Sequence, residues 1–205
     1  MENIAPTKSN LMSAQNSLEF SVKGFELLDK KRNVLIREMM SYMGRAEKLQ
    51  SRINVTFKDA YDALRQANIS IGINTVEDIA MSVPEASDYS VLFKSVMGVE
   101  VSHVNFEKKD IEPKYSFYRS NATMDLAFKK FNEVKYLIYE LAEVENAVYK
   151  LAVEVKKTQK RANALENIQI PKFKVIVKGI GEVLEEKERE DFFRLKVVKK
   201  KKNRK

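Results

Sequence analysis

Few residues of this chain have the chemistry of a catalytic centre, and their spacing does not assemble one. Cysteine is absent and His103 is the only histidine, so the chain has no thiol nucleophile and cannot gather several histidines around a metal ion. A serine triad would have to form around His103, for which an ordinary place in a hairpin is the simpler interpretation. Gly179-Ile180-Gly181 lacks the third glycine and the strand-then-helix context of a dinucleotide-binding loop, and no Walker-type phosphate loop occurs.

Carboxylates are concentrated near the C-terminus, on a segment whose composition predicts a helix. They alternate with Lys187 and Arg189, a pattern typical of a solvated helix face with ion pairs three and four residues apart. General acid–base catalysis also needs a cleft, which a pair of helices does not provide. The acidic residues are Glu182, Glu185, Glu186, Glu188, Glu190 and Asp191. We therefore expect no catalytic residue, no metal site and no cofactor, and we expect the chain not to be an enzyme by itself.

The elements that position these residues are two long arms, each with a seam of inward-facing residues. The seams advance by alternating steps of three and four residues, which indicates a coiled coil. The first comprises Leu11, Ala14, Leu18, Ser21, Phe25, Leu28, Arg32, Leu35, Met39, Tyr42, Ala46, Leu49 and Ile53. The second comprises Phe131, Val134, Ile138, Leu141, Val144, Val148, Leu151, Val155, Thr158, Ala162, Leu165 and Ile168. Because a separate region connects the arms, the simplest way to bury both seams is for the chain to fold back on itself.

The fold class is therefore mainly α: a long antiparallel two-helix coiled coil, with a short β-hairpin and small helices in the middle of the chain. We predict four segments. They are an N-terminal coiled-coil arm at 1–68, a middle region at 69–122, a C-terminal coiled-coil arm at 123–196 and a basic tail at 197–205. Alternating apolar residues from Tyr89 onward predict the hairpin at about 90–106, with Met97 and Gly98 at its turn.

Helix ends and interruptions are marked by a few polar residues, prolines and glycines. Thr7 or Ser9 can cap the first arm and Asn121 or Thr123 the second, while Thr75 could cap a short helix over Val76–Met81. Asp110 to Pro113 is expected to end the hairpin region. Pro171 removes a backbone donor, so the sequence predicts a kink or short break there, before Gly179 and Gly181.

Charge is distributed unevenly along the chain. The net charge of +8 comes from residues 194–205, which hold eight basic residues and no acidic ones, leaving 29 basic and 29 acidic residues elsewhere. A solvated end or an anion-binding segment are both compatible with this tail. No aromatic residue follows Phe193 to stack on nucleic-acid bases, so we expect no nucleic-acid partner.

The same composition bears on location. No stretch of about 18 uncharged apolar residues is present, which argues against membrane insertion. The N-terminus lacks the basic-then-apolar layout of a secretory signal, and the absence of cysteine fits a reducing compartment. The sequence thus predicts a cytoplasmic protein.

Three features point to partner surfaces or internal polar contacts. Arg32 falls on the seam and, if the arms fold back, near Gln159 to Arg161, where it either forms a register-fixing polar layer or extends outward. Phe192, Phe193 and Leu195 would lie beyond the end of the first arm, without an intramolecular partner. The rings of Tyr136, Tyr139 and Tyr149 are either part of the core or the contact surface of a lateral protein partner.

Four stretches of the sequence resemble the D subunit of the V-type and archaeal A-type rotary ATPases, in the same order along essentially the whole chain. They are PTKSNL at 6–11, LLDKKRNVLIRE at 27–38, VMGVEV at 96–101, and RANALENIQIPKFK through LEEKEREDFFRLK at 161–196. Two departures are local: Asn33 replaces an expected acidic residue after the arginine, and Gly179 and Gly181 stand where better helix formers are usual.

The resemblance implies a central rotor shaft whose termini insert into a hexamer of catalytic A and non-catalytic B subunits, which binds the ATP. The F subunit would bind the shaft laterally, and another protein would link it to the membrane ring, so the chain would be peripheral to the membrane. An asymmetric shaft would bias the nucleotide affinity of each catalytic interface, and nucleotide turnover would turn the shaft. We expect hexamer contacts at Lys8, Lys30, Lys31, Arg32, Arg161, Arg189, Phe192, Phe193 and Arg194, and lateral contacts at the three tyrosines.

Two other functions are compatible with paired helices. A prefoldin-like chaperone subunit also places hairpins between helices, although the arms here are long for one. A nucleic-acid-binding coiled coil that uses the basic tail would show steeply salt-dependent binding that is lost when residues 194–205 are removed.

Overall fold

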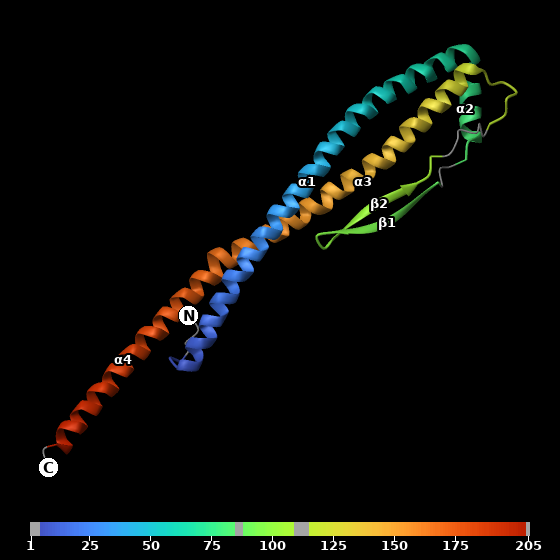
Figure 1. Ribbon diagram of the computed structural model, residues 1–205. Coiled ribbons are helices and arrows are strands. Elements are labelled where there is room, and N and C mark those ends of the chain that lie inside the picture. Colours follow the sequence, from blue (N-terminus) through green and yellow to red (C-terminus); the bar gives the residue numbers. More distant parts are fainter. Residues whose placement is uncertain (1–4, 85–87, 109–114, 204–205) are drawn as a thin grey trace. The chain divides into compact units, whose positions relative to one another are not determined.

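The structure is a computed structural model that describes residues 5–84, 88–108 and 115–203 (Figure 1). Four α-helices, one hairpin and one π-helical turn make up the described chain. In order these are α1 (Lys8–Ile71), α2 (Ile73–Ser82), β1 (Tyr89–Val96), β2 (Val99–Phe106), α3 (Ala122–Ala164), the π turn η1 (Leu165–Gln169) and α4 (Ile170–Lys202). The predicted fold class, mainly α with a short β-hairpin and a small helix in the middle, is confirmed.

The chain forms two compact units. One, here called the terminal unit, consists of residues 1–33 and 155–205, and the other, the central unit, consists of residues 34–154. The long helices α1 and α3 contribute to both units. Thr7 caps α1 by accepting the Asn10 N–H at 3.3 Å, and Asn121 caps α3 by accepting the Met124 N–H at 3.1 Å, as the sequence predicted.

In the terminal unit, the first half of α1 runs antiparallel to the end of α3, the π turn and α4. Arg32 meets Gln159, whereas Gly24, two helical turns earlier, faces Leu165. The buried residues between these helices are mostly small: Ala14, Ser21, Thr158, Ala162 and Ile180. Every residue from 185 to 203 is exposed, so the last part of α4 has no covering element within this unit.

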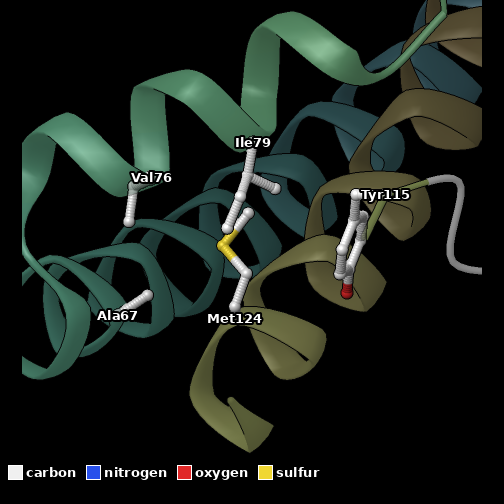
Figure 2. Close-up of a cluster of buried hydrophobic side chains, with 5 residues drawn as sticks. All are labelled: Ala67, Val76, Ile79, Tyr115 and Met124. Atoms are coloured by element: carbon white, nitrogen blue, oxygen red, sulfur yellow. The ribbon is translucent and has the colours of Figure 1, made fainter. Parts of the chain in front are cut away.

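In the central unit, the second half of α1 runs antiparallel to α3, and α2 closes the end of the pair. Asn121 and Thr123 at the start of α3 both hydrogen-bond the Ser70 hydroxyl near the end of α1, at 2.7 and 2.9 Å. A buried cluster lies beneath α2, where the Ile79 side chain points toward Met124 (Figure 2). Its members are Ala67, Val76, Ile79, Tyr115 and Met124.

The hairpin belongs to the central unit and lies alongside α3 (Figure 1). β1 and β2 pair antiparallel from Tyr89 opposite Phe106 to Val96 opposite Val99. The two turn residues, Met97 and Gly98, have φ angles of 52° and 81°. Positive φ at both central positions is the geometry of a type I′ turn, whose twist matches that of the strands.

The predicted first seam is confirmed, because every one of its residues is buried or half-buried. The second seam is wrong at two positions: Ile138 and Ile168 are 42% and 62% exposed. At the first, Leu137 is buried instead. At the second, the wide π turn changes the spacing of inward positions, as described below.

The predicted cap of the short helix and the break predicted at Pro171 are also wrong. Thr75 does not cap α2, because the positive φ of Gly72 (87°) turns the chain directly from α1 and α2 begins at Ile73. No break occurs at Pro171, because α4 continues directly from the π turn, where the Ile170 N–H donates to the Leu165 carbonyl. The π turn just before it keeps the helix continuous. The end predicted at Asp110 to Pro113 lies outside the described residues.

Candidate partner-binding surfaces

The hairpin is held on α3 by one largely buried carboxylate. Glu143, whose side chain is 19% exposed, accepts a hydrogen bond from the Val104 backbone N–H at 3.0 Å and contacts His103 Nδ1 at 2.8 Å. Val104 lies on the outer edge of β2, so its N–H points away from β1. Glu143 therefore satisfies a backbone donor that would otherwise lie at an open strand edge, and it fixes the distance between hairpin and helix.

A second anchor lies at the start of the hairpin. The Asp88 carboxylate accepts hydrogen bonds from Lys135 Nζ at 2.8 Å and from the Tyr139 hydroxyl at 3.2 Å. The hydrogen bond from Lys135 holds the pKa of Asp88 below its ordinary value. Burial, reinforced by the bond to Asp88, raises the pKa of Tyr139 to about 12. With Glu143, this anchor attaches the hairpin to α3 at two points.

The hairpin packs on two of the three tyrosines expected to bind a lateral partner. The Tyr136 ring stacks on Phe106 at 5.6 Å between centroids, and the Tyr139 ring lies 5.1 Å from Tyr89 and 5.5 Å from Phe106. Both tyrosines are half-buried. Tyr149 instead is 70% exposed. The structure thus gives Tyr136 and Tyr139 an internal role and leaves Tyr149 as the most accessible ring of the three.

Strand β1 is open to solvent along nearly its whole length. All residues of β1 except Val96 are exposed, and the Phe93 side chain is 68% exposed. Phe93 is covered on one face by Lys150 Nζ, which lies 5.1 Å from the ring centroid. The central unit therefore presents apolar strand residues and the Tyr149 ring at its surface.

Arg32 forms the polar layer that was one of the two sequence interpretations. Its guanidinium donates to Gln159 Oε1 at 2.8 Å and forms a 2.5 Å ion pair with Asp29. The Arg32 side chain is 23% exposed, so the alternative in which it extends freely into solvent is wrong. A half-buried polar layer favours one alignment of the two helices over shifted ones.

The other basic residues predicted to contact a partner lie at the surface of the terminal unit. Lys8, Lys30 and Arg161 are exposed and Lys31 is half-buried. Near the end of α4, Arg189 and Arg194 form loose ion pairs with Glu185 and Glu190 at 3.8 and 3.5 Å. These pairs are solvated, so each contributes little to stability.

The apolar residues at the end of α4 have no partner within the described chain. Phe192, Phe193 and Leu195 are 58%, 65% and 68% exposed, which confirms the prediction that they are left uncovered. Lys196 Nζ lies 5.0 Å from the Phe192 ring. Together with Arg189 and Arg194, the two phenylalanines form a surface that is both apolar and cationic.

The residues that anchor the hairpin carry no recognisable signal in the sequence. Asp88, Lys135 and Glu143 are ordinary charged residues in a chain that is 32% charged, and only the tertiary fold brings them to the hairpin. Within the described ranges, no group of three or more histidine, aspartate and glutamate side chains is arranged to hold a metal ion. Likewise, no helix there is both long and apolar enough to cross a membrane.

Comparison with known proteins gives a match along nearly the full chain. The model of a family described as the D subunit of ATP synthase matches residues 10–200. The V-type ATP synthase D subunit of Thermotoga neapolitana is 43% identical, over 97% of this chain and 98% of its own length. The A-type ATP synthase D subunit of Methanobrevibacter smithii is 39% identical, over 97% of this chain and 87% of its own length. The A-type ATP synthase D subunit of Thermococcus kodakarensis is 38% identical, over 96% of this chain and 94% of its own length.

Proposed function

This chain belongs to the ATP synthase D-subunit family, and from that membership we propose that it is the central rotor shaft of a V-type or A-type ATPase. In this role it couples ATP turnover in a catalytic hexamer to ion translocation by a membrane ring. The observation that carries the proposal is the extent of the match, which includes both long helices, the hairpin and the exposed end of α4. Neither the chaperone nor the nucleic-acid alternative gains support.

The terminal unit supplies the features that a hexamer-facing end needs. Its helix pair is thin, and the exposed apolar and cationic surface of Phe192, Phe193, Arg189 and Arg194 is suited to a surrounding protein. Exposed Lys8, Lys30 and Arg161, with Lys31, add positive charge along the same unit. Arg32 we assign to the alignment of the helices, because its guanidinium is already bonded to Gln159 and Asp29.

The chain itself contributes mechanics, not bond chemistry. A helix pair is not symmetric about its axis, so it contacts the successive catalytic interfaces differently at each angle. The angle of the shaft then biases the nucleotide affinity of each interface, and by linkage the nucleotide state biases the angle. We propose that the A and B subunits bind ATP and that this chain acts as a non-catalytic subunit.

The central unit carries the remaining partner surfaces in this proposal. The lateral F subunit would bind around Tyr149 and the accessible edges of Tyr136 and Tyr139. A further protein would link the shaft to the membrane ring. Because the chain acts through these partners, we place it in the cytoplasm, peripheral to the membrane.

Two measurements test the proposal. A tagged copy purified from its host should bring down one catalytic hexamer per chain, whereas a hexamer of small coiled-coil subunits would contradict it. In addition, the double variant F192S/F193S should weaken binding to the hexamer about tenfold or more and leave the lateral partner bound. Y149S should weaken binding to the lateral partner and leave the hexamer bound. Loss of both partners in both variants, or of neither, would refute the assignment of the two surfaces.

A further inference from the structure

The π turn η1 adds one residue to the spacing of inward positions on the C-terminal arm. The Ile170 N–H donates to the Leu165 carbonyl, five residues back, in place of the four of an α-helix. Inward positions therefore step from Leu165 by five to Ile170, both half-buried. The extra residue also turns Ile168 outward, to 62% exposure.

The π turn makes little contact with the neighbouring helix. Four of its five residues, 166–169, are exposed, so only Leu165 packs against the neighbouring helix. Pro171 follows two residues later and supplies no backbone N–H to the carbonyls of the turn. Wide turns and prolines are the usual places where long helices bend.

The opposite helix has its own weak point at the same level. A Cβ atom added to Gly24 of α1 would lie 3.6 Å from Leu165 Cδ1, so Gly24 directly faces the π turn. Glycine is among the residues that least favour a helix, because it leaves the backbone the most freedom. Leu165 thus packs on bare backbone, without an intervening side chain. The other interior glycine of α1, Gly44, has no atom within 4 Å of such a Cβ.

We propose that Gly24 and the π turn Leu165–Gln169 together form a hinge, at which the helix pair of the terminal unit bends or twists. Each feature alone weakens one helix, whereas their coincidence at one level weakens both. The hinge is a property of the free chain. Its consequence rests on the function proposed above: in a rotor shaft, it would allow the exposed end of α4 to change angle by a small amount before the rest of the pair follows.

Two changes should remove the hinge without shifting the helices. Deletion of Asn167 takes out the extra residue, so the step from Leu165 to the next inward position becomes four and all later positions keep their orientation. G24A adds a methyl group at ordinary contact distance from Leu165 and favours the helix. G44A is the matched control, because it makes the same substitution in the same helix, away from the turn.

Distances between spin labels measure the hinge in the full-length chain. Since the sequence has no cysteine, a pair of cysteines introduced at two exposed positions can carry the two spin labels. Lys157 and Val175 lie on either side of the turn, and Lys48 and Gln66 form a control pair within α1. Each pair is about 18 residues apart, on the order of 27 Å of helix.

In the unmodified chain, the 157/175 distance distribution should be clearly wider than that of 48/66. G24A combined with deletion of Asn167 should narrow it to the control width, and G44A should leave it wide. Equal widths in the unmodified chain would overturn the proposal, as would a width that the combined variant does not reduce. Because the measurement uses the isolated chain, its outcome does not depend on whether the shaft assignment holds.

Discussion

Replacement of Glu143 by alanine should release the hairpin from α3 while leaving the helix pair folded. The variant E143A removes the acceptor of the half-buried Val104 N–H and the partner of His103. A hydrogen bond to a charged group is worth about 1.5–3 kcal/mol. His103 adds little, because its side chain is 54% exposed and its pair with Glu143 is partly solvated. We expect the hairpin to open about 2 kcal/mol more easily, or roughly thirtyfold more often.

Native-state hydrogen exchange of the strand amides measures this opening. E143Q keeps an oxygen that can accept from Val104, so its effect should be clearly smaller than that of E143A. E145A is the matched control, because Glu145 is an exposed glutamate on the same helix. The reasoning would be refuted if E143A accelerated exchange in β2 no more than E145A does. It would also be refuted if E143Q matched E143A, since the charge and not the hydrogen bond would then hold the hairpin.

Three further predictions concern the packing, the pH dependence and the turn of the central unit. L35A should lower the free energy of unfolding by about 2–5 kcal/mol in urea titrations, because Leu35 is fully buried, whereas L27A, at a position 68% exposed, should change it by about 0.5 kcal/mol or less. The hydrogen bond from neutral Tyr139 to Asp88 should stabilise the fold fully below about pH 10, and this contribution should be lost as the pH rises through about 12. Y139F should lack this loss when the free energy of unfolding is measured against pH. M97N should raise the unfolding free energy by up to about 1 kcal/mol, because asparagine tolerates the positive φ at that position better than methionine does; an unchanged or lower value would argue against strain at the turn.

The parts of the fold that follow from local periodicity could be predicted from the sequence. The first seam, the hairpin turn and the caps at Thr7 and Asn121 each depend on a repeating step or on residues next to one another in the chain. The anchors of the hairpin could not be predicted in this way. Glu143 is separated from Val104 by 39 residues, and nothing in its neighbourhood distinguishes it from the many solvated glutamates.

The π turn shows why a regular seam can mislead. Steps of three and four continue past Leu165 to Ile168 in the sequence, because an apolar residue happens to lie there. A single inserted residue does not alter the composition of a helix, so periodicity alone cannot detect it. Pro171 is the available signal of a disturbance in the helix. The disturbance, however, is a wide turn before the proline and not a break at it.

The two units differ in how their helices are held together, and the difference fits the proposed roles. The central unit buries large side chains such as Leu35 and Leu151, together with the cluster under α2. The terminal unit buries mainly alanine, serine and threonine, with the Arg32 layer to set the alignment. Burial of small side chains removes little apolar surface from water, so it contributes little free energy. The Arg32 layer therefore sets the alignment of the terminal helices, but their packing contributes little free energy. A partner that binds the folded terminal unit would stabilise it by mass action. In the proposed role, the terminal unit would therefore gain the most from the subunits that bind it, whereas the central unit is held by its own core.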